Sequence, residues 1–397
     1  MAAFSTPAAT AAPHVTQAPL TSSRKHITMC LSPKLGGGGG GGQRARLASS
    51  AAPPVRALAP ATEAEEAAVP SPAPVNVEYL AAEFAGHGVG FEPVGGSCAV
   101  KMALSNGSVA HVLLPSGLVT SYKPAMWHGT ITEVLHTNVA EGPGGRAVIR
   151  GGVSVDLRCA GVAGDGGWSL GGAWSLRDIE LASAAPGNAA AARCVVTLHP
   201  EALAMELAVT NTASSPVALS CGVSNHLRVS TPDATYALGL QGSEYRSVEP
   251  ALSEFSIVPP DYGDAARQPS AAGTTAARHR WANRGFDMIL SGGGRGPGAA
   301  DEPDGEEDDD YKHMTDAMCR VYSHAPREFT IIDRGRRNSV RLHRRGFEEL
   351  YVFSPGSQYQ WYGKYAYVVV GPAMLEPVVL GPGETWQGAQ YLRNPNL

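Results

Sequence analysis

The stretch YVVVGPAMLEPVVLGPGETW, Tyr367 to Trp386, contains two valine-rich apolar runs and ends in a Gly-Pro-Gly sequence. β-branched residues favour strands, whereas glycine and proline favour turns. The stretch therefore predicts a strand that is followed by a tight turn. Further short runs with period two are separated by Gly, Pro, Asn and Ser, among them CAVKMAL, VAHVLLP, RCVVTLHP, ELAVTNT and FTIID. Such runs predict an all-β sandwich or barrel rather than a parallel α/β sheet.

The first 62 residues differ in composition from the rest of the 397-residue chain. They contain no Asp or Glu, many Ser, Thr, Ala and Pro residues, a glycine run at 36–42, and six basic residues. A basic, acid-free, hydroxyl-rich N-terminus is typical of an organelle transit peptide, with a disordered tail as the alternative. Removing its six positive charges changes the net charge from −5 to −11. An acidic body argues against nucleic acid as a partner.

The remaining chain is expected to form a linker at 63–75 and one β domain at 76–397. A short helix is predicted in NVEYLAAEFAG, with Asn76 as its cap. Residues 291–310, SGGGRGPGAADEPDGEEDDD, have almost no apolar side chains and end in an acidic run. They are predicted to be a mobile, solvated insertion, with an acidic docking segment as the alternative.

Cysteine and histidine spacing gives no metal motif. The six cysteines lack CxxC spacing and mostly lie in apolar runs, which favours buried free thiols. His128 and His136 flank Glu133, but their spacing fits no standard zinc pattern. Neither a metal nor a cofactor is expected.

Four segments, in order, resemble the galactose mutarotase-like superfamily and its glucose-6-phosphate 1-epimerase-like branch. They are ELAVTNTASSPVALSCGVSNHLRVST at 206–231, ALGLQGSEY at 237–245, LYVFSPGSQ at 350–358 and LGPGETW at 380–386. The resemblance implies a large antiparallel β-sandwich of the supersandwich type, preceded here by a disordered N-terminal segment.

Two further segments resemble a group of plant chloroplast proteins that are built on the same fold. SGLVTSYKPAMWHGTITEVLHT, residues 116–137, and the ending LGPGETWQGAQYLRNPNL are similar to subcomplex B subunits of the photosynthetic NADH dehydrogenase-like (NDH) complex. The similarity leaves open whether the chain is related to the second subunit or to its paralogue in NDH-dependent cyclic electron flow. It implies a chloroplast protein, peripheral on the stromal side of the thylakoid membrane, whose partners are other NDH subunits and, indirectly, photosystem I.

The same resemblance implies a site in which a Glu and a His exchange protons with the sugar. A carboxylate base and a protonated imidazole suit the opening and reclosing of a hemiacetal. His226 matches the histidine, but Gly371 stands at the carboxylate position, so His226 is interpreted as vestigial. Glu376 is the alternative carboxylate, whereas Glu384 lies in the closing turn and is expected to be exposed.

RGGV, which begins at Arg150, resembles an Arg-Gly-Gly-Ile segment of the same branch, so Arg150 is the candidate for holding a sugar phosphate, whose geometry a guanidinium matches. A surface arginine beside a glycine turn is the alternative. Trp127, Trp361 and Trp386 could stack on a sugar, but such residues more often fill a core or an interface.

These observations predict a non-catalytic NDH subunit that supports cyclic electron flow around photosystem I. A plastid hexose-phosphate 1-epimerase (an aldose mutarotase) and a carbohydrate-binding module are the alternatives.

Overall fold

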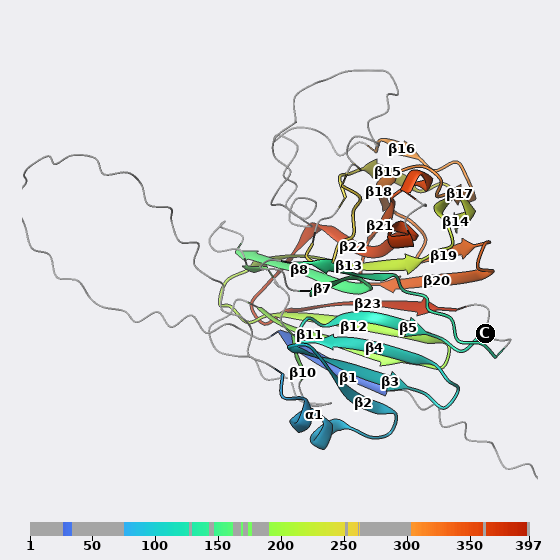
Figure 1. The fold of residues 1–397 in the computed structure, drawn as a ribbon. Coiled ribbons are helices and arrows are strands. Elements are labelled where there is room, and N and C mark those ends of the chain that lie inside the picture. The colour runs from blue at the N-terminus through green and yellow to red at the C-terminus, as the bar shows by residue number, and fades with distance from the viewer. Residues whose placement is uncertain are drawn as a thin grey trace, which may run out of the picture.

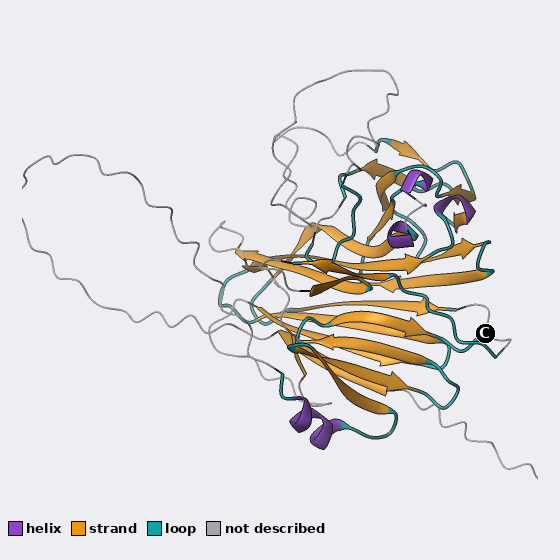
Figure 2. Ribbon diagram, viewed as in Figure 1, coloured by secondary structure: helices purple, strands orange, loops and turns teal. Residues whose placement is uncertain are grey.

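Strands dominate the computed structural model (Figure 2), as expected for an all-β protein. The structure describes residues 27–33, 75–126, 129–142, 147–161, 168–169, 174–176, 190–250, 253–260, 262, 303–359 and 363–394. The helices are α1 (Val77–Phe84), η2 (Pro232–Ala234), η3 (Ser357–Tyr359) and η4 (Gly363–Tyr365). Helix α1 begins after Asn76, whose side chain accepts a hydrogen bond from the Tyr79 N–H at 3.0 Å, and this confirms the predicted cap.

A nine-stranded antiparallel sheet forms one layer of the sandwich. It contains β1 (Ile27–Pro33), β10 (Trp174–Leu176), β11 (Ala190–Leu198), β12 (Ala202–Asn211), β14 (Thr235–Leu238), β17 (Tyr311–His313), β19 (Glu328–Asp333), β20 (Asn338–Arg345) and β23 (Thr385–Arg393). The order across the sheet is β10-β1-β11-β12-β23-β20-β19-β14-β17.

A twelve-stranded antiparallel sheet forms the second layer. It contains β2 (Val89–Val94), β3 (Ser97–Ala103), β4 (Val109–Leu114), β5 (Leu118–Lys123), β8 (Val153–Gly161), β9 (Trp168–Ser169), β13 (Val217–Arg228), β15 (Glu244–Ser247), β16 (Gly305–Glu306), β18 (Met318–Ser323), β21 (Glu349–Ser354) and β22 (Tyr367–Leu380). The order is β16-β15-β18-β21-β22-β13-β8-β5-β4-β3-β2, with β9 beside β8. Strands β6 (Thr137–Glu141) and β7 (Ala147–Gly151) form a separate ribbon. Figure 1 places α1 beside β2 at one end of the sandwich and β14 to β18 at the other.

The core lies between the two sheets and follows from the period-two pattern. On β3, Cys98, Val100 and Met102 are buried, whereas the residues between them are half-buried. On the central strand β13 every residue is buried except Ala218, which is half-buried, and Arg228, which is exposed, because both faces of this strand are covered. A polar contact also crosses the core, where the Asn225 side chain donates to the Gln390 amide oxygen at 2.9 Å.

Asn211 lies in one of the two connections that pass between the sheets and forms hydrogen bonds with the other. It ends β12 and precedes the passage to β13, while residues 381–384 carry the chain from β22 to β23. The Asn211 side chain donates to the Leu380 carbonyl, and its backbone exchanges hydrogen bonds with Gly383 and Glu384, each at 2.9 Å. The Gly-Pro-Gly turn is therefore held at one end of the sandwich. Glu384 lies in this turn and is exposed, as expected.

The N-terminal segment is not wholly without structure, in contrast to the sequence-based expectation. Residues 27–33, ITMCLSP, form β1, which pairs antiparallel with β10 and β11. The local sequence alternates apolar residues with others, which suits a strand, but composition over 62 residues hides this short pattern. The rest of the predicted transit peptide and residues 63–74 of the linker lie outside the described residues.

The end of the predicted acidic insertion also differs from a solvated loop. Strand β16 pairs with β15, and Glu307 is buried. Its carboxylate accepts from Tyr322 and Arg320 at 2.8 Å and lies 3.2 Å from the Lys312 Nζ. Because these groups compensate its charge, Glu307 can be buried even though it lies in a run of acidic residues. Residues 291–302 of the insertion lie outside the described residues.

Four of the cysteines and the helices of the described segments complete the description of the fold. Cys98, Cys159, Cys221 and Cys319 are buried free thiols, as predicted. None of the helices in the described segments is long and apolar enough to cross a membrane.

Candidate functional site

His226 lies on β13, on the face of the twelve-stranded sheet that points away from the nine-stranded sheet. Its neighbour Asn225 points into the core toward Gln390, and successive side chains on a strand alternate between faces. On β22 the register partner of His226 is Val369. This is the position that sequence analysis assigned to the vestigial histidine.

The His226 ring is enclosed by aromatic groups rather than by an open sugar pocket. It is only 2% exposed, and its ring centroid lies 5.5 Å from that of Tyr367. Tyr367 also stacks on His136 at 5.2 Å, and its hydroxyl donates to the Ile257 carbonyl. Ile257 belongs to a second apolar cluster that covers this face together with side chains of β18, β21 and β22. The space beside His226 is therefore filled by the protein itself.

Burial keeps the His226 imidazole neutral. The pKa of His226 is lowered to about 3, chiefly by loss of solvation; a hydrogen bond to the Gly152 backbone opposes this shift, and repulsion from His136 adds to it. The Nδ1 atom is buried and has no hydrogen-bond partner. A general acid works best when its pKa is near the operating pH. A histidine with so low a pKa is almost entirely neutral near neutral pH, so the imidazolium form that could act as a general acid is scarcely populated.

Gly371 lies where no side chain fits. A Cβ atom built on this glycine would lie 1.6 Å from the Val223 carbonyl oxygen and 2.8 Å from its carbon. The obstacle is backbone on the paired strand β13, which cannot move aside as a flexible side chain could. The expected absence of a carboxylate at this position therefore has a steric basis, because even alanine would force β13 and β22 apart.

Glu376, the alternative carboxylate, does not approach His226. It lies on the exposed end of β22, whereas His226 pairs with Val369. At about 3.3 Å per residue, the two positions are roughly 23 Å apart along the strand. A proton exchange with one sugar ring cannot span that distance.

Two polar residues that sequence analysis missed lie on β8 and share the face of His226. Ser154 is opposite Ser224 and Asp156 is opposite Gly222 on β13. The Ser154 hydroxyl and the Asp156 Oδ2 are buried without partners. Burial, and then the nearby Glu254, raise the pKa of Asp156 to about 7. The alternation in VSVDL could have indicated that these side chains share a face, but not which face.

Asp156 is also poorly placed to act with His226. Gly222 and His226 are roughly 13 Å apart along β13, at about 3.3 Å per residue. The two titratable groups therefore lie at separate points of the sheet and do not form an acid–base pair.

Arg150, the sugar-phosphate candidate, lies on the β6–β7 ribbon opposite Asn138. Its Nε atom and both polar side-chain atoms of Asn138 are buried without partners. The Arg150 Nε and the Asn138 side-chain amide therefore have hydrogen-bonding capacity that no group in the described residues uses.

The remaining sequence candidates have structural partners or lie outside the described residues. Glu133 accepts hydrogen bonds from Ser121 and from the Tyr122 and Leu135 backbone at 2.5–3.0 Å. The His136 Nε2 lies 2.8 Å from the Lys364 carbonyl oxygen. Trp386 packs edge-on against Phe347 at 5.1 Å. Trp127, His128 and Trp361 are not among the described residues. Within the described segments, His, Cys, Asp and Glu side chains form no group that could hold a metal ion.

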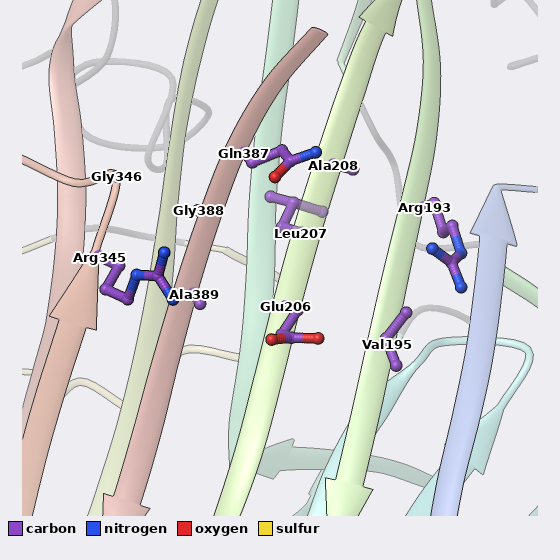
Figure 3. Close-up of a pocket in the computed structure, with 10 residues that line it drawn as sticks. All are labelled: Arg193, Val195, Glu206, Leu207, Ala208, Arg345, Gly346, Gln387, Gly388 and Ala389. Carbon is purple, nitrogen blue, oxygen red and sulfur yellow. The ribbon is translucent and has the colours of Figure 1, made fainter.

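A cleft of about 340 Å³ lies on the nine-stranded sheet, whereas His226 lies on the twelve-stranded sheet. Figure 3 shows Arg193, Glu206, Arg345 and Gln387 around a floor of small residues that includes Ala208, Gly388 and Ala389. Glu206 accepts a hydrogen bond from the Tyr391 hydroxyl at 3.3 Å. The cleft contains both signs of charge and is an open surface groove.

The described strands form a two-layer antiparallel β-sandwich, as the resemblance to the galactose mutarotase-like superfamily implied. Two solved structures that are similar to it are galactose mutarotase-like proteins from Clostridium acetobutylicum and Lactobacillus casei. The first has a TM-score of 0.48 and 12% identity, and the match covers 78% of this chain and 98% of that protein. The second has a TM-score of 0.41 and 12% identity, with 75% and 99% covered.

A closer relationship exists at the level of sequence. The chain is 37% identical over 345 residues to the Arabidopsis thaliana protein NDH-dependent cyclic electron flow 5, and the match covers 82% of this chain and 84% of the relative. The chain therefore belongs to the family of that protein. No family model matches it.

Proposed function

We propose that this protein is a non-catalytic component of the chloroplast NDH complex that supports its assembly or activity in cyclic electron flow around photosystem I. Its partners are subunits of subcomplex B, and it is peripheral on the stromal side of the thylakoid membrane. The observation that carries the proposal is the 37% identity with a protein named for NDH-dependent cyclic electron flow. The acid-free N-terminus supports a chloroplast location.

The state of the His226 position supports a non-catalytic role. Mutarotation needs two groups that exchange protons with the sugar, and each general acid or base typically contributes about 10²- to 10⁴-fold in rate. Here the histidine is neutral and covered, and a side chain at Gly371 is sterically excluded. The fold is retained as a scaffold whose outer surfaces are available for contacts with other proteins.

The proposal is tested in plants that lack this protein. We expect loss of the NDH supercomplex from native gels of thylakoid membranes and loss of the transient rise in chlorophyll fluorescence after illumination. The wild-type gene and a His226→Gln variant should both restore these signals, because His226 performs no proton transfer. A normal supercomplex and a normal fluorescence rise in the mutant plants would contradict the proposal.

The rival epimerase function is tested with the purified protein. Polarimetry and NMR exchange with glucose, galactose and glucose 6-phosphate should show no anomer interconversion above buffer. Turnover that disappears in the His226→Gln variant would establish an enzyme instead.

A further inference from the structure

Strand β1 lies between β11 and β10 in the nine-stranded sheet, although it comes from the segment that is predicted to be a transit peptide. Residues 27–31 pair in register with residues 198–194 of β11, and residues 31–33 pair with residues 176–174 of β10. Cleavage near the end of the predicted 62-residue transit peptide would remove β1 and leave one side of β11 without a partner.

The side of β11 that β1 covers is unsuited to exposure. Cys194, Val196 and Leu198 on this strand are at most 1% exposed and belong to the main core. The strand AAARCVVTL has no proline, and Arg193 is its only charged residue. An uncovered edge of this kind presents a row of unpaired backbone N–H and C=O groups together with apolar side chains, and it is a template for pairing with another strand.

The other terminal strands of the sandwich carry features that prevent such pairing. At the far end of the same sheet, β17 has only three residues and contains Lys312. In the twelve-stranded sheet, β16 has two residues, and β2 contains Pro93 and Glu92. Short length, charge and proline are the usual protections of an edge. β11 has none of these protections apart from the charge of Arg193, which is consistent with an edge that is paired in the functional protein.

We propose that the β11 edge of the mature protein accepts an extended segment of a neighbouring subunit, and that residues 27–33 occupy this edge only in the precursor. The inference rests on the proposed function, because it requires cleavage after import and a multisubunit complex. The register of β1 defines the occupant. Ile27, Met29 and Leu31 stand opposite Leu198, Val196 and Cys194, so the partner segment carries apolar residues at alternate positions. Backbone pairing supplies the affinity and the alternate side chains supply the specificity in this mode of binding.

The test uses the full-length precursor with the photoreactive residue p-benzoylphenylalanine in place of Arg193, imported into chloroplasts of plants that lack the endogenous protein. The matched control carries the same residue in place of Tyr311, which is exposed on β17 at the opposite edge of the sheet. Mass spectrometry identifies the N-terminus of the processed protein and the polypeptide that is crosslinked.

We expect the processed chain to begin after Pro33. The precursor in solution should crosslink from position 193 to its own residues 27–33. The processed protein in the NDH complex should crosslink from position 193 to a different polypeptide, at least fivefold more efficiently than from position 311. Substitution at Ala191 instead of Arg193 repeats the measurement if the first variant fails to fold.

Four results would overturn the inference. They are a processed chain that begins before Ile27, equal crosslinking from both edges, crosslinking from β11 only to a second copy of this chain, and no crosslink from position 193 in the NDH complex. Native gels of the same samples distinguish failure of the proposed function from failure of the β11 pairing proposal alone. If the processed protein does not migrate with the NDH complex, the proposed function fails; if it does but position 193 finds no partner strand, only the present inference fails.

Discussion

Replacing Gly371 by alanine should destabilise the sandwich at its centre. The added Cβ would lie 1.6 Å from the Val223 carbonyl oxygen, whereas real Cβ contacts are essentially never shorter than 3.0 Å. The two central strands would have to separate by about 1.4 Å, in an interior packed as densely as an organic crystal. Overpacking of a core typically costs about 1 to 3 kcal/mol, and a backbone obstacle places this substitution at or above about 3 kcal/mol.

Gly90 on β2 provides a matched control, because it is also a strand glycine but has no atom within 4 Å of its added Cβ. We expect Gly90→Ala to change stability by less than about 1 kcal/mol. Calorimetry of the purified proteins should show a melting temperature about 5 °C or more lower for Gly371→Ala and nearly unchanged for Gly90→Ala. A Gly371→Ala protein that melts within 1 °C of the wild type would refute the steric argument, as would a folded Gly371→Glu protein that interconverts sugar anomers.

Three further predictions concern buried titratable groups and can be tested by thermal unfolding. The folded-state pKa of Asp156 is raised to about 7 from 3.8, so its burial increasingly costs stability as the pH rises through this interval. Asp156→Asn should therefore raise the melting temperature at pH 8 more than at pH 4, and equal shifts would contradict the raised pKa. His226 has the opposite sign, because its folded pKa is lowered from 6.5 to about 3 and stability is lost as the pH falls below 6.5. His226→Gln should reduce the loss of stability between pH 7 and pH 5, and an unaltered slope would show that His226 is not buried neutral. Glu307→Gln should cost about 2 kcal/mol or more because it breaks a buried charge cluster, whereas the exposed control Asp308→Asn should cost less than about 0.5 kcal/mol; similar losses in both variants would contradict the burial of Glu307.

The sandwich could be predicted because period-two alternation is a local signal. It is visible in CAVKMAL, where Cys98, Val100 and Met102 all enter the core. β1 could not be recognised, because seven residues of strand pattern lie within a long basic, glycine-containing segment. Whether such a pattern forms a strand depends on an edge at β11 that is more than 150 residues away in the sequence.

The sequence indicated which residues to compare at the candidate site but not their geometry. The family resemblance implied that Gly371 stands at the carboxylate position, but only the backbone separation of β13 and β22 shows that Gly371 excludes a side chain. The neutral state of His226 depends on Tyr367 and Ile257, which are distant in sequence, and no local pattern reports such packing. The burial of Glu307 was missed for the same reason, since its partners Arg320 and Tyr322 follow on another strand.

The position of β22 and β23 has a consequence for how the chain reaches its final form. These strands follow all the other described strands in the sequence, yet β23 lies between β12 and β20, and β22 lies between β13 and β21. Until they emerge, each layer consists of two unjoined halves whose inner strands are unpaired on one side, and most of the missing pairing is between residues far apart in the chain. Contacts of this kind form slowly and leave apolar edges exposed in the meantime. The sandwich therefore closes only after residue 393 has left the ribosome, and loss of residues 367–393 would remove the middle of both layers.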